Sequence, residues 1–222
     1  MVSTRLQAYL KLLTSLVAFK RRVMGAVIGQ FGHPRGIGGR LVGWTIGRRS
    51  SNVQRSEWAV SLLGLYAGAR VLEVGCGPGV ALAAALRSGA QVVGVDRSEV
   101  MIGQARRRNR DAVQDGRLEL VVASVDDLPT FAAPFDEALA VNTIGHWDSA
   151  LHGLERIREA LCPGAILAAV SQPRCPGATA EHSRAAGEEL ARQLTTGGYR
   201  EPRMETLDLD PPPMCVLASS PL

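Results

Sequence analysis

The chain has 222 residues, of which 46% are hydrophobic, 5% aromatic and 21% charged, with a net charge of +4. This length and composition suit one globular α/β domain with an extension and argue against gross disorder. The four cysteines form no C-x-x-C pair, so neither a disulfide framework nor a cysteine metal site is indicated, and we expect reduced thiols in a cytoplasmic protein.

Charge divides the chain near residue 56. The residues before Glu57 include ten basic and no acidic side chains, whereas the rest has 15 basic and 21 acidic ones, a balance of −6. We therefore predict a basic extension over residues 1–56 and a separate globular domain over 57–222. Apolar residues recur at helical intervals from Ser3 to Gly29, which predicts one or two amphipathic helices. The uncharged run Leu12 to Phe19 is too short to span a bilayer.

Three roles stay open for this extension: a lid over the domain, peripheral contact with an anionic membrane, and nucleic-acid binding. The next segment, Gln30 to Asn52, is rich in glycine and basic residues. We interpret it as a loop with a short helix around Leu41 to Arg48, near the mouth of a site. Candidate residues for a substrate pocket in this segment are Phe31, His33 and Trp44, although three such residues more often serve ordinary packing.

A helix is expected from Ser56 to Leu65, capped by Ser56, with Trp58 and Leu62 on one face. The stretch VLEVGCGPGV, Val71 to Val80, then combines a β-branched strand, three glycines and the start of an Ala-rich helix. Strand, glycine turn and helix follow without a spacer, which is typical of a nucleotide-cofactor site.

Two acids indicate which cofactor this turn binds. A dinucleotide fingerprint would place its third glycine at position 80, where the chain has Val80. Glu73 precedes the turn, and Asp96 closes the next strand, Gln91 to Val95. Carboxylates there would repel a diphosphate but favour a ligand with a sulfonium and an ammonium group, such as S-adenosylmethionine. Asp96 is placed to accept from ribose hydroxyls.

The remaining elements alternate between helix and strand. Ser98 is a plausible N-cap for a helix to about Val113, whose arginines at 106, 107, 108 and 110 indicate a solvated face or, as the alternative, an RNA contact. Further strands are expected at Arg117 to Val122, Ala138 to Val141 and Ala165 to Val170. Further helices are expected at Ser149 to Leu161 and Glu181 to Leu194, before a hairpin of Arg203 to Leu209 and Met214 to Ser219.

The order of VLEVGCGPG, VVGVDRSEVMIGQARRR, ASVDDLP, FDEALAVNTIGHW and REALCPGAIL resembles the class I S-adenosylmethionine-dependent methyltransferases, particularly the methyltransferase 11 type. The resemblance covers about Leu62 to Ser171. It implies an α/β, Rossmann-like, doubly wound, seven-stranded and mainly parallel sheet with an antiparallel last strand, here preceded by an N-terminal helical extension.

The resemblance also implies cofactor-binding residues. Gly75, Cys76, Gly77 and Gly79 would admit the methionine part of S-adenosylmethionine, Glu73 its ammonium group, and Asp96 its ribose. Ser124 stands where the family often has a carboxylate that accepts from the adenine amino group, and the backbone N–H of Val125 would face the ring. Asn142 would lie at the carboxyl end of the fourth strand, facing cofactor and acceptor.

His146, in the loop after that strand, is the candidate for proton abstraction, with pocket shaping as the alternative. Trp147 is a candidate acceptor contact. No metal-ligand cluster is visible in the sequence, so we predict a metal-free reaction.

We predict methyl transfer to a small, apolar metabolite or lipid by a cytoplasmic protein, with peripheral membrane association as an alternative. An RNA methyltransferase and a catalytically silent cofactor-binding scaffold remain the alternative functions. The ten basic residues before Glu57 favour the first of these, and Ser124 favours the second.

Overall fold

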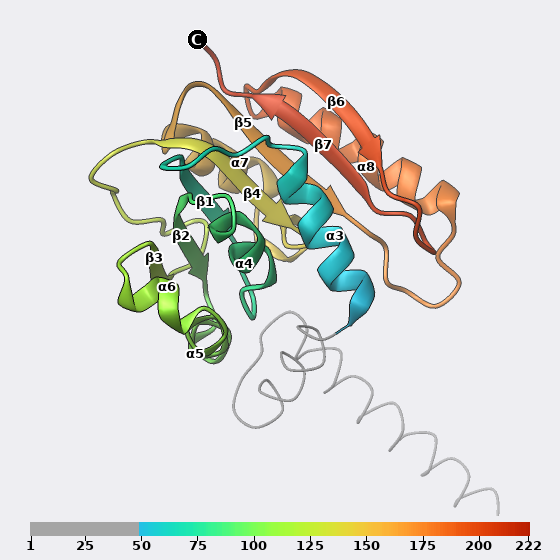
Figure 1. Ribbon diagram of the computed structural model, residues 1–222. Helices are drawn as coiled ribbons and strands as arrows, with labels where there is room; N and C mark the ends of the chain where they lie inside the picture. The colour runs from blue at the N-terminus through green and yellow to red at the C-terminus, as the bar shows by residue number, and fades with distance from the viewer. Residues whose placement is uncertain (1–48) are drawn as a thin grey trace, which may run out of the picture.

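The computed structural model describes residues 49–222 (Figure 1). The helices predicted between Ser3 and Gly29 and around Leu41 to Arg48 lie outside the described residues, as do Phe31, His33 and Trp44. None of the helices from residue 49 onward is both long enough and apolar enough to cross a membrane.

A seven-stranded sheet in the order β3-β2-β1-β4-β5-β7-β6 forms the centre of the domain. Its strands are β1 (Arg70–Val74), β2 (Gln91–Asp96), β3 (Leu118–Val122), β4 (Phe135–Val141), β5 (Leu161–Ser171), β6 (Arg200–Thr206) and β7 (Met214–Ser219). Neighbouring strands from β3 to β5 pair in parallel, and β7 pairs antiparallel with both β5 and β6. The predicted doubly wound sheet with an antiparallel last strand is confirmed.

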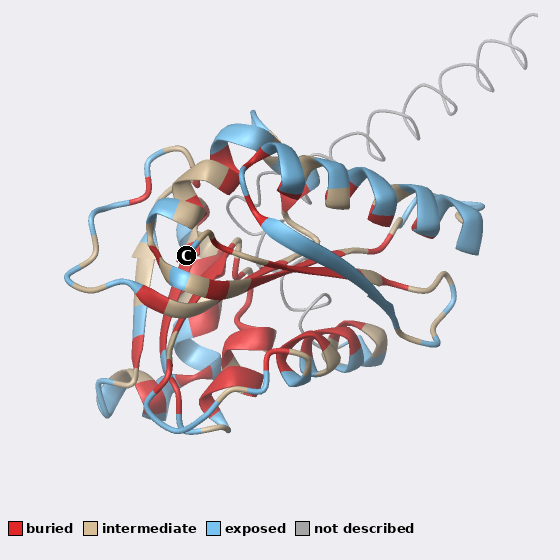
Figure 2. Ribbon diagram, turned by 90° about the horizontal axis from the view of Figure 1, so that it is seen from above, coloured by how far each residue is buried: buried red, intermediate tan, exposed pale blue. Residues whose placement is uncertain are grey.

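Helices cover both faces of this sheet (Figures 1 and 2). One layer contains α3 (Ser50–Ser61), α4 (Val80–Leu86), α5 (Glu99–Arg108) and α6 (Arg110–Gln114), and the other contains α7 (Ala150–Glu159) and α8 (Ala180–Thr196). Two hydrophobic clusters result because successive strand residues point to opposite faces: Val71 packs under the α3 and α4 layer, and Leu72 under α7 and α8. The parallel strands therefore read as continuous apolar runs in the sequence.

Several predicted boundaries are correct and others are wrong. Ser98 caps α5 by accepting from the backbone N–H of Met101, and Arg106 to Arg108 are exposed, as expected for a solvated face. The helix expected to reach Val113 breaks at Asn109, whose side-chain amide donates to the Gly79 and Ala105 carbonyls. The first hairpin strand is β6, which begins at Arg200 and ends at Thr206, three residues earlier than predicted at each end.

Helix α3 departs most from the prediction. It begins at Ser50, and Ser56 is a buried residue inside the helix rather than its cap. The buried positions are Asn52, Arg55, Ser56, Ala59 and Val60. This spacing is helical, so the face of α3 that packs on the domain is polar over its first turns and becomes apolar only from Ala59 onward.

Candidate cofactor and acceptor site

The glycine turn between β1 and α4 is tied to the neighbouring strand by its backbone. The N–H groups of Gly75 and Cys76 both donate to the carbonyl of Val95 on β2, at 2.8 and 3.0 Å. Burial raises the pKa of the Cys76 thiol well above its ordinary value, so this residue is a neutral, small member of the turn. The turn is therefore a fixed backbone feature at the carboxyl end of β1.

The three glycines of the turn differ in what a side chain at each position would meet. All three adopt positive φ angles, of 73°, 52° and 76° for Gly75, Gly77 and Gly79. A Cβ on Gly75 would lie 2.0 Å from the Thr143 hydroxyl oxygen, and one on Gly79 would lie 2.7 Å from the Asn109 amide nitrogen. Within the part of the chain that the structure describes, a Cβ on Gly77 would meet no atom within 4 Å. Gly75 and Gly79 thus allow other residues of the protein to approach closely, and of these three glycines only Gly77 faces open space among the described residues.

Glu73 lies at the base of this turn and is 2% exposed. The backbone N–H of Leu82 in the first turn of α4 donates to its carboxyl group, but the buried Oε2 atom has no hydrogen-bond partner among residues 49–222. Burial, aided by the charge of Asp96, raises the pKa of Glu73 to about 8, against the smaller opposing effect of the Leu82 hydrogen bond. A buried carboxyl oxygen that lacks a donor is costly, and a cationic ligand group would satisfy it.

Asp96 ends β2 and faces the same turn. Its two carboxylate oxygens accept from the backbone N–H groups of Gly77 (2.9 Å) and Ser98 (2.8 Å). Burial raises the pKa of Asp96, and these two hydrogen bonds oppose the shift. Each oxygen has a second lone pair, so the carboxylate retains acceptor capacity for a hydroxyl donor.

These residues fit S-adenosylmethionine. The turn offers open space at Gly77, an unpartnered buried oxygen on Glu73 and a fixed second carboxylate on Asp96. Two acids next to the turn, Glu73 on β1 and Asp96 at the end of β2, suit a ligand with a sulfonium, an ammonium group and ribose hydroxyls, and they would repel a diphosphate.

The loop after β3 uses its polar groups locally. The Ser124 hydroxyl donates to the Asp127 carboxylate and accepts from the Asp127 backbone N–H, both at 3.3 Å. Asp127 thus acts as a loop-capping acid. Val125 is buried against the α7 side of the sheet. The adenine contacts of Ser124 and Val125 stay predictions.

The loop after β4 brings several predicted residues together. Asn142 has a positive φ of 55°, and its side chain is engaged with β5: Oδ1 accepts from the Gln172 N–H at 2.7 Å and Nδ2 donates to the Gln172 carbonyl. Its side-chain amide therefore joins two strand ends, and contact with the cofactor stays a prediction. The Trp147 indole donates to the Thr143 hydroxyl, so Trp147 is connected to the residue that touches Gly75.

His146 is the last residue of the short 3-10 helix η1 (Ile144–His146) and is exposed. Its position after β4 agrees with the expected loop, and its role as a base stays a prediction. Thr143 was not singled out from the sequence, because no local pattern announces a contact with a glycine 68 positions earlier.

Sequence reasoning also missed a polar cluster beyond Asn142. Arg55 donates to Oε1 of Gln172 at 2.6 Å, Arg174 donates to the same oxygen at 3.1 Å, and Arg174 also donates to Asn52. The available signal was the helical spacing of Asn52, Arg55 and Ser56, which continues the apolar face of α3. These residues were not considered for the buried face because they are polar.

Comparisons with known proteins agree with this geometry. A family model described as a methyltransferase domain matches residues 71–164. The Bacillus subtilis (strain 168) protein named uncharacterized methyltransferase YdaC is 28% identical over 78% of this chain and 94% of its own length. A 24-methylenesterol C-methyltransferase 2 of Oryza sativa subsp. japonica is 35% identical over 44% of this chain, which spans only 27% of that relative.

Among solved structures, the N-methyltransferase NodS from Bradyrhizobium japonicum WM9, in complex with S-adenosyl-L-homocysteine, superposes with a TM-score of 0.65. It has 17% sequence identity and covers 81% of this chain and 92% of its own, so this likeness concerns the fold. Fold and turn together define a Rossmann-like protein that binds an adenosyl cofactor. The methyltransferase-domain match and the relatives and solved structures named as methyltransferases support a class I S-adenosylmethionine-dependent methyltransferase. The finer assignment to the methyltransferase 11 type stays a prediction.

Proposed function

We propose that this protein transfers the methyl group of S-adenosylmethionine to a small metabolite or lipid with an apolar body. The glycine turn carries the proposal, because it combines open space at Gly77 with a buried carboxyl oxygen of Glu73 at its base and the Asp96 carboxylate that accepts from the Gly77 N–H. The relative named for a 24-methylenesterol supports an apolar acceptor.

Each residue of the turn has a defined task in this proposal. S-adenosylmethionine supplies an electrophilic methyl group on a positively charged sulfur. Glu73 pairs with the ammonium group, Asp96 accepts from the ribose hydroxyls, and Gly77 leaves room for the methionine part. Holding two reactants in line is worth about 7 to 11 kcal/mol of the barrier in the most favourable cases.

The acceptor lies at the carboxyl ends of β4 and β5 in this proposal, because ligands of open parallel sheets bind outside strand ends. His146 would take a proton from the attacking acceptor atom at an imidazole nitrogen, or shape the pocket where no base is needed. Trp147 borders the same loop through its hydrogen bond to Thr143. The basic extension over residues 1–56 would close the site and exclude water.

Calorimetry with S-adenosylmethionine tests the cofactor half of the proposal. We expect saturable binding by the full chain and a large loss in an Asp96→Ala variant. A preference for a nicotinamide dinucleotide, or no binding of the methyl donor at millimolar concentration, would contradict it.

Mass spectrometry tests the acceptor half. A host extract is incubated with the full chain and a cofactor carrying an isotopically labelled methyl group, and we expect the label in a small, apolar product. Label in RNA would favour the RNA methyltransferase alternative. Cofactor binding without any labelled product would favour the scaffold.

A further inference from the structure

Two guanidinium groups share one neutral oxygen near the carboxyl ends of β4 and β5. Arg55, on the inner face of α3, is only 5% exposed and donates through Nη1 to Oε1 of Gln172. Arg174, just beyond β5, donates through Nη2 to the same oxygen. The Gln172 amide is fixed with this oxygen toward the arginines, because its Nε2 donates to the carbonyl of Pro211 at 2.6 Å.

No carboxylate neutralises this pair. Within residues 49–222, neither arginine forms an ion pair, and Asp210, which precedes Pro211, is joined to neither guanidinium. The first 48 residues contain no Asp or Glu, so they have no side-chain carboxylate to offer. Burial, together with the charge of Arg174, lowers the pKa of Arg55 to about 9, which leaves it charged at neutral pH. A buried, uncompensated charge of this kind is unfavourable.

Arg55 also retains an unused donor. Its Nε atom is buried and has no hydrogen-bond partner among the described residues. A guanidinium carries five N–H donors in a planar fork whose geometry matches the two oxygens of a carboxylate or phosphate. The pair is thus short of one partner, and the missing partner has the chemistry of an oxyanion.

The location of the pair connects it with the cofactor turn. Gln172 is hydrogen-bonded to Asn142 through its backbone, and the next residue, Thr143, is the one that contacts Gly75. The arginines therefore lie along the edge formed by the carboxyl ends of the strands, on the side of β4 away from β1, and ligands of open parallel sheets bind outside such strand ends.

We propose that Arg55 and Arg174, held in place by Gln172 and Asn52, bind an oxyanion group of the methyl acceptor. This inference rests on the proposed function and narrows its substrate class. The acceptor would have an apolar body and a carboxylate or phosphate group, and the arginines would fix its orientation relative to the cofactor turn.

Calorimetry on the full chain tests this site at about 0.15 M salt, which is the physiological ionic strength. The probes are benzoate, phenyl phosphate and benzyl alcohol, which share a ring and differ in its substituent, each titrated with and without S-adenosylhomocysteine. We expect at least one anion to bind about tenfold or more tighter than the alcohol, since charge-assisted bidentate bonds are the strong ones. Preference for benzoate indicates a carboxylate source, and preference for phenyl phosphate indicates a phosphate source.

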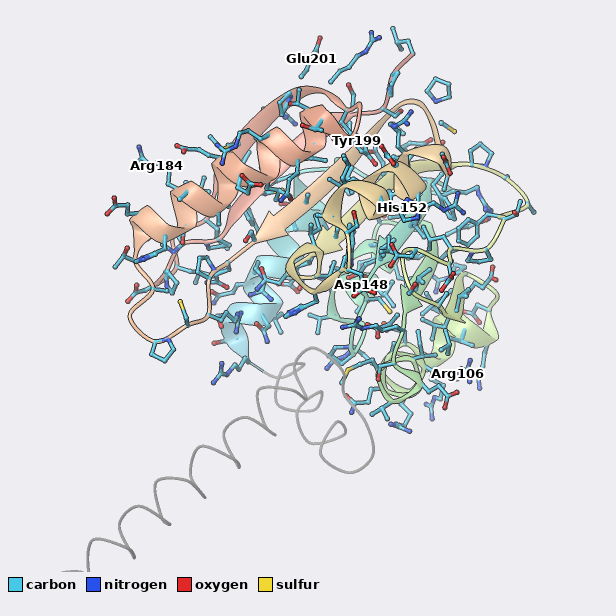
Figure 3. All side chains as sticks on the ribbon, turned by 180° about the vertical axis from the view of Figure 1, so that it is seen from behind. Arg106, Asp148, His152, Arg184, Tyr199 and Glu201 are labelled. Carbon is cyan, nitrogen blue, oxygen red and sulfur yellow. The ribbon has the colours of Figure 1, made fainter. Side chains whose placement is uncertain are left out.

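Substitutions at two arginines test whether the anion binds at the Arg55 and Arg174 pair. Arg174→Gln should lower the affinity for the preferred anion about tenfold, while Arg184→Gln should leave it unchanged, because Arg184 is an exposed residue on the outer side of α8 (Figure 3). Anions that bind no tighter than benzyl alcohol, or equal losses in the two variants, would overturn the proposal. Anion binding without S-adenosylhomocysteine binding would instead refute the proposed function and leave the oxyanion site standing.

Discussion

The raised pKa of Glu73 has consequences for stability and for cofactor binding that can be measured. Its pKa is raised from 4.5 to about 8, mainly by burial. Between these two values the folded state keeps a proton that the unfolded chain has released, so the free energy of unfolding falls as pH rises, by at most about 1.4 kcal/mol per pH unit. Stability of the cofactor-free protein is therefore expected to decline from pH 5 to pH 8.

A Glu73→Gln variant should abolish this part of the decline. At pH 8 we expect the cofactor-free variant to exceed the natural chain by about 1 kcal/mol or more, a rise in Tm of about 2 to 4 °C. Thermal unfolding from pH 5 to pH 8 measures it. Glu119→Gln is the matched control, because Glu119 is an exposed strand residue. Equal pH slopes in the natural chain and Glu73→Gln would show that Glu73 is ionised throughout.

The same carboxyl group should make cofactor binding depend on pH. The ammonium group of S-adenosylmethionine pairs with ionised Glu73, so below about pH 8 binding must expel a proton. We expect affinity to rise from pH 6 to pH 8 by at most about tenfold per unit, and Glu73→Gln to be weaker and flat. If the cofactor affinity of the natural chain does not change with pH, Glu73 does not pair with the ammonium group.

Gly77 allows a test that separates backbone strain from ligand contact. Gly77 and Gly64 both have positive φ angles, of 52° and 60°, and a Cβ on either would meet no described residue within 4 Å. Alanine should therefore cost each site a similar strain of about 1 to 2 kcal/mol in unfolding free energy. Only Gly77→Ala should also weaken cofactor binding, by tenfold or more, as measured by calorimetry. Equal cofactor affinity in the two variants would place the ligand elsewhere.

At the scale of the elements, the sequence predicted those features that depend on neighbours in the chain. The strand, glycine turn and helix of Val71 to Val80 and the cap at Ser98 are local signals, and the structure has both. The predicted start of α3 was wrong because the N-cap residue, Arg49, makes no side-chain capping bond, so the sequence has no capping signature there.

Contacts between distant segments account for what the sequence did not reveal. Gly75 was expected to admit the ligand, yet the atom that approaches it belongs to Thr143, on the loop after another strand. Likewise, Arg55 becomes a buried residue because Gln172, 117 positions later, accepts its hydrogen bond. Composition gives no information about either pairing, since each depends on the order of strands in the sheet.

Helix α7 shows how the loop after β4 depends on packing. A Cβ on Gly153 would lie 2.5 Å from the Trp147 ring and 2.9 Å from Val125. Glycine-to-alanine changes inside helices normally stabilise by about 1 kcal/mol, but Gly153→Ala should destabilise, because it displaces Trp147 and with it the contact to Thr143. We also expect weaker cofactor binding.

Gly103→Ala in α5 is the control for this change, since a Cβ there would meet no atom of residues 49–222 within 4 Å. It should raise Tm or leave it unchanged, with cofactor affinity unaltered. Denaturant unfolding and calorimetry on both variants measure the two effects. A Gly153→Ala protein as stable as Gly103→Ala would show that Trp147 moves without cost.

On the scale of the whole molecule, charge is arranged along one edge of the sheet. Glu73 and Asp96 lie at the carboxyl ends of β1 and β2, and the arginine pair lies beyond β4. A cationic donor would bind over the acids and an anionic acceptor over the arginines. The two ligands would then attract each other as well as the protein, with little screening once water is excluded.

The basic extension would complete this arrangement as a lid. If the part of this extension that precedes α3 closes the site, a chain lacking residues 1–29 should keep its cofactor affinity within about twofold, because the residues of the glycine turn all lie after α3 in the chain. Its turnover of the labelled acceptor should fall about tenfold or more, since an open site admits water and loses alignment.

A further variant of the full chain distinguishes a lid from a segment that binds anionic partners through its charge. In this variant Lys20, Arg21 and Arg22 are changed to Gln. This variant should retain turnover if the extension acts by covering the site, whereas a membrane or nucleic-acid role would make it as defective as the deletion in binding anionic vesicles or RNA. Steady-state kinetics and binding at two salt concentrations give both readouts, because phosphate contacts weaken steeply with salt. Unchanged turnover after the deletion would mean that the domain from residue 57 closes its own site.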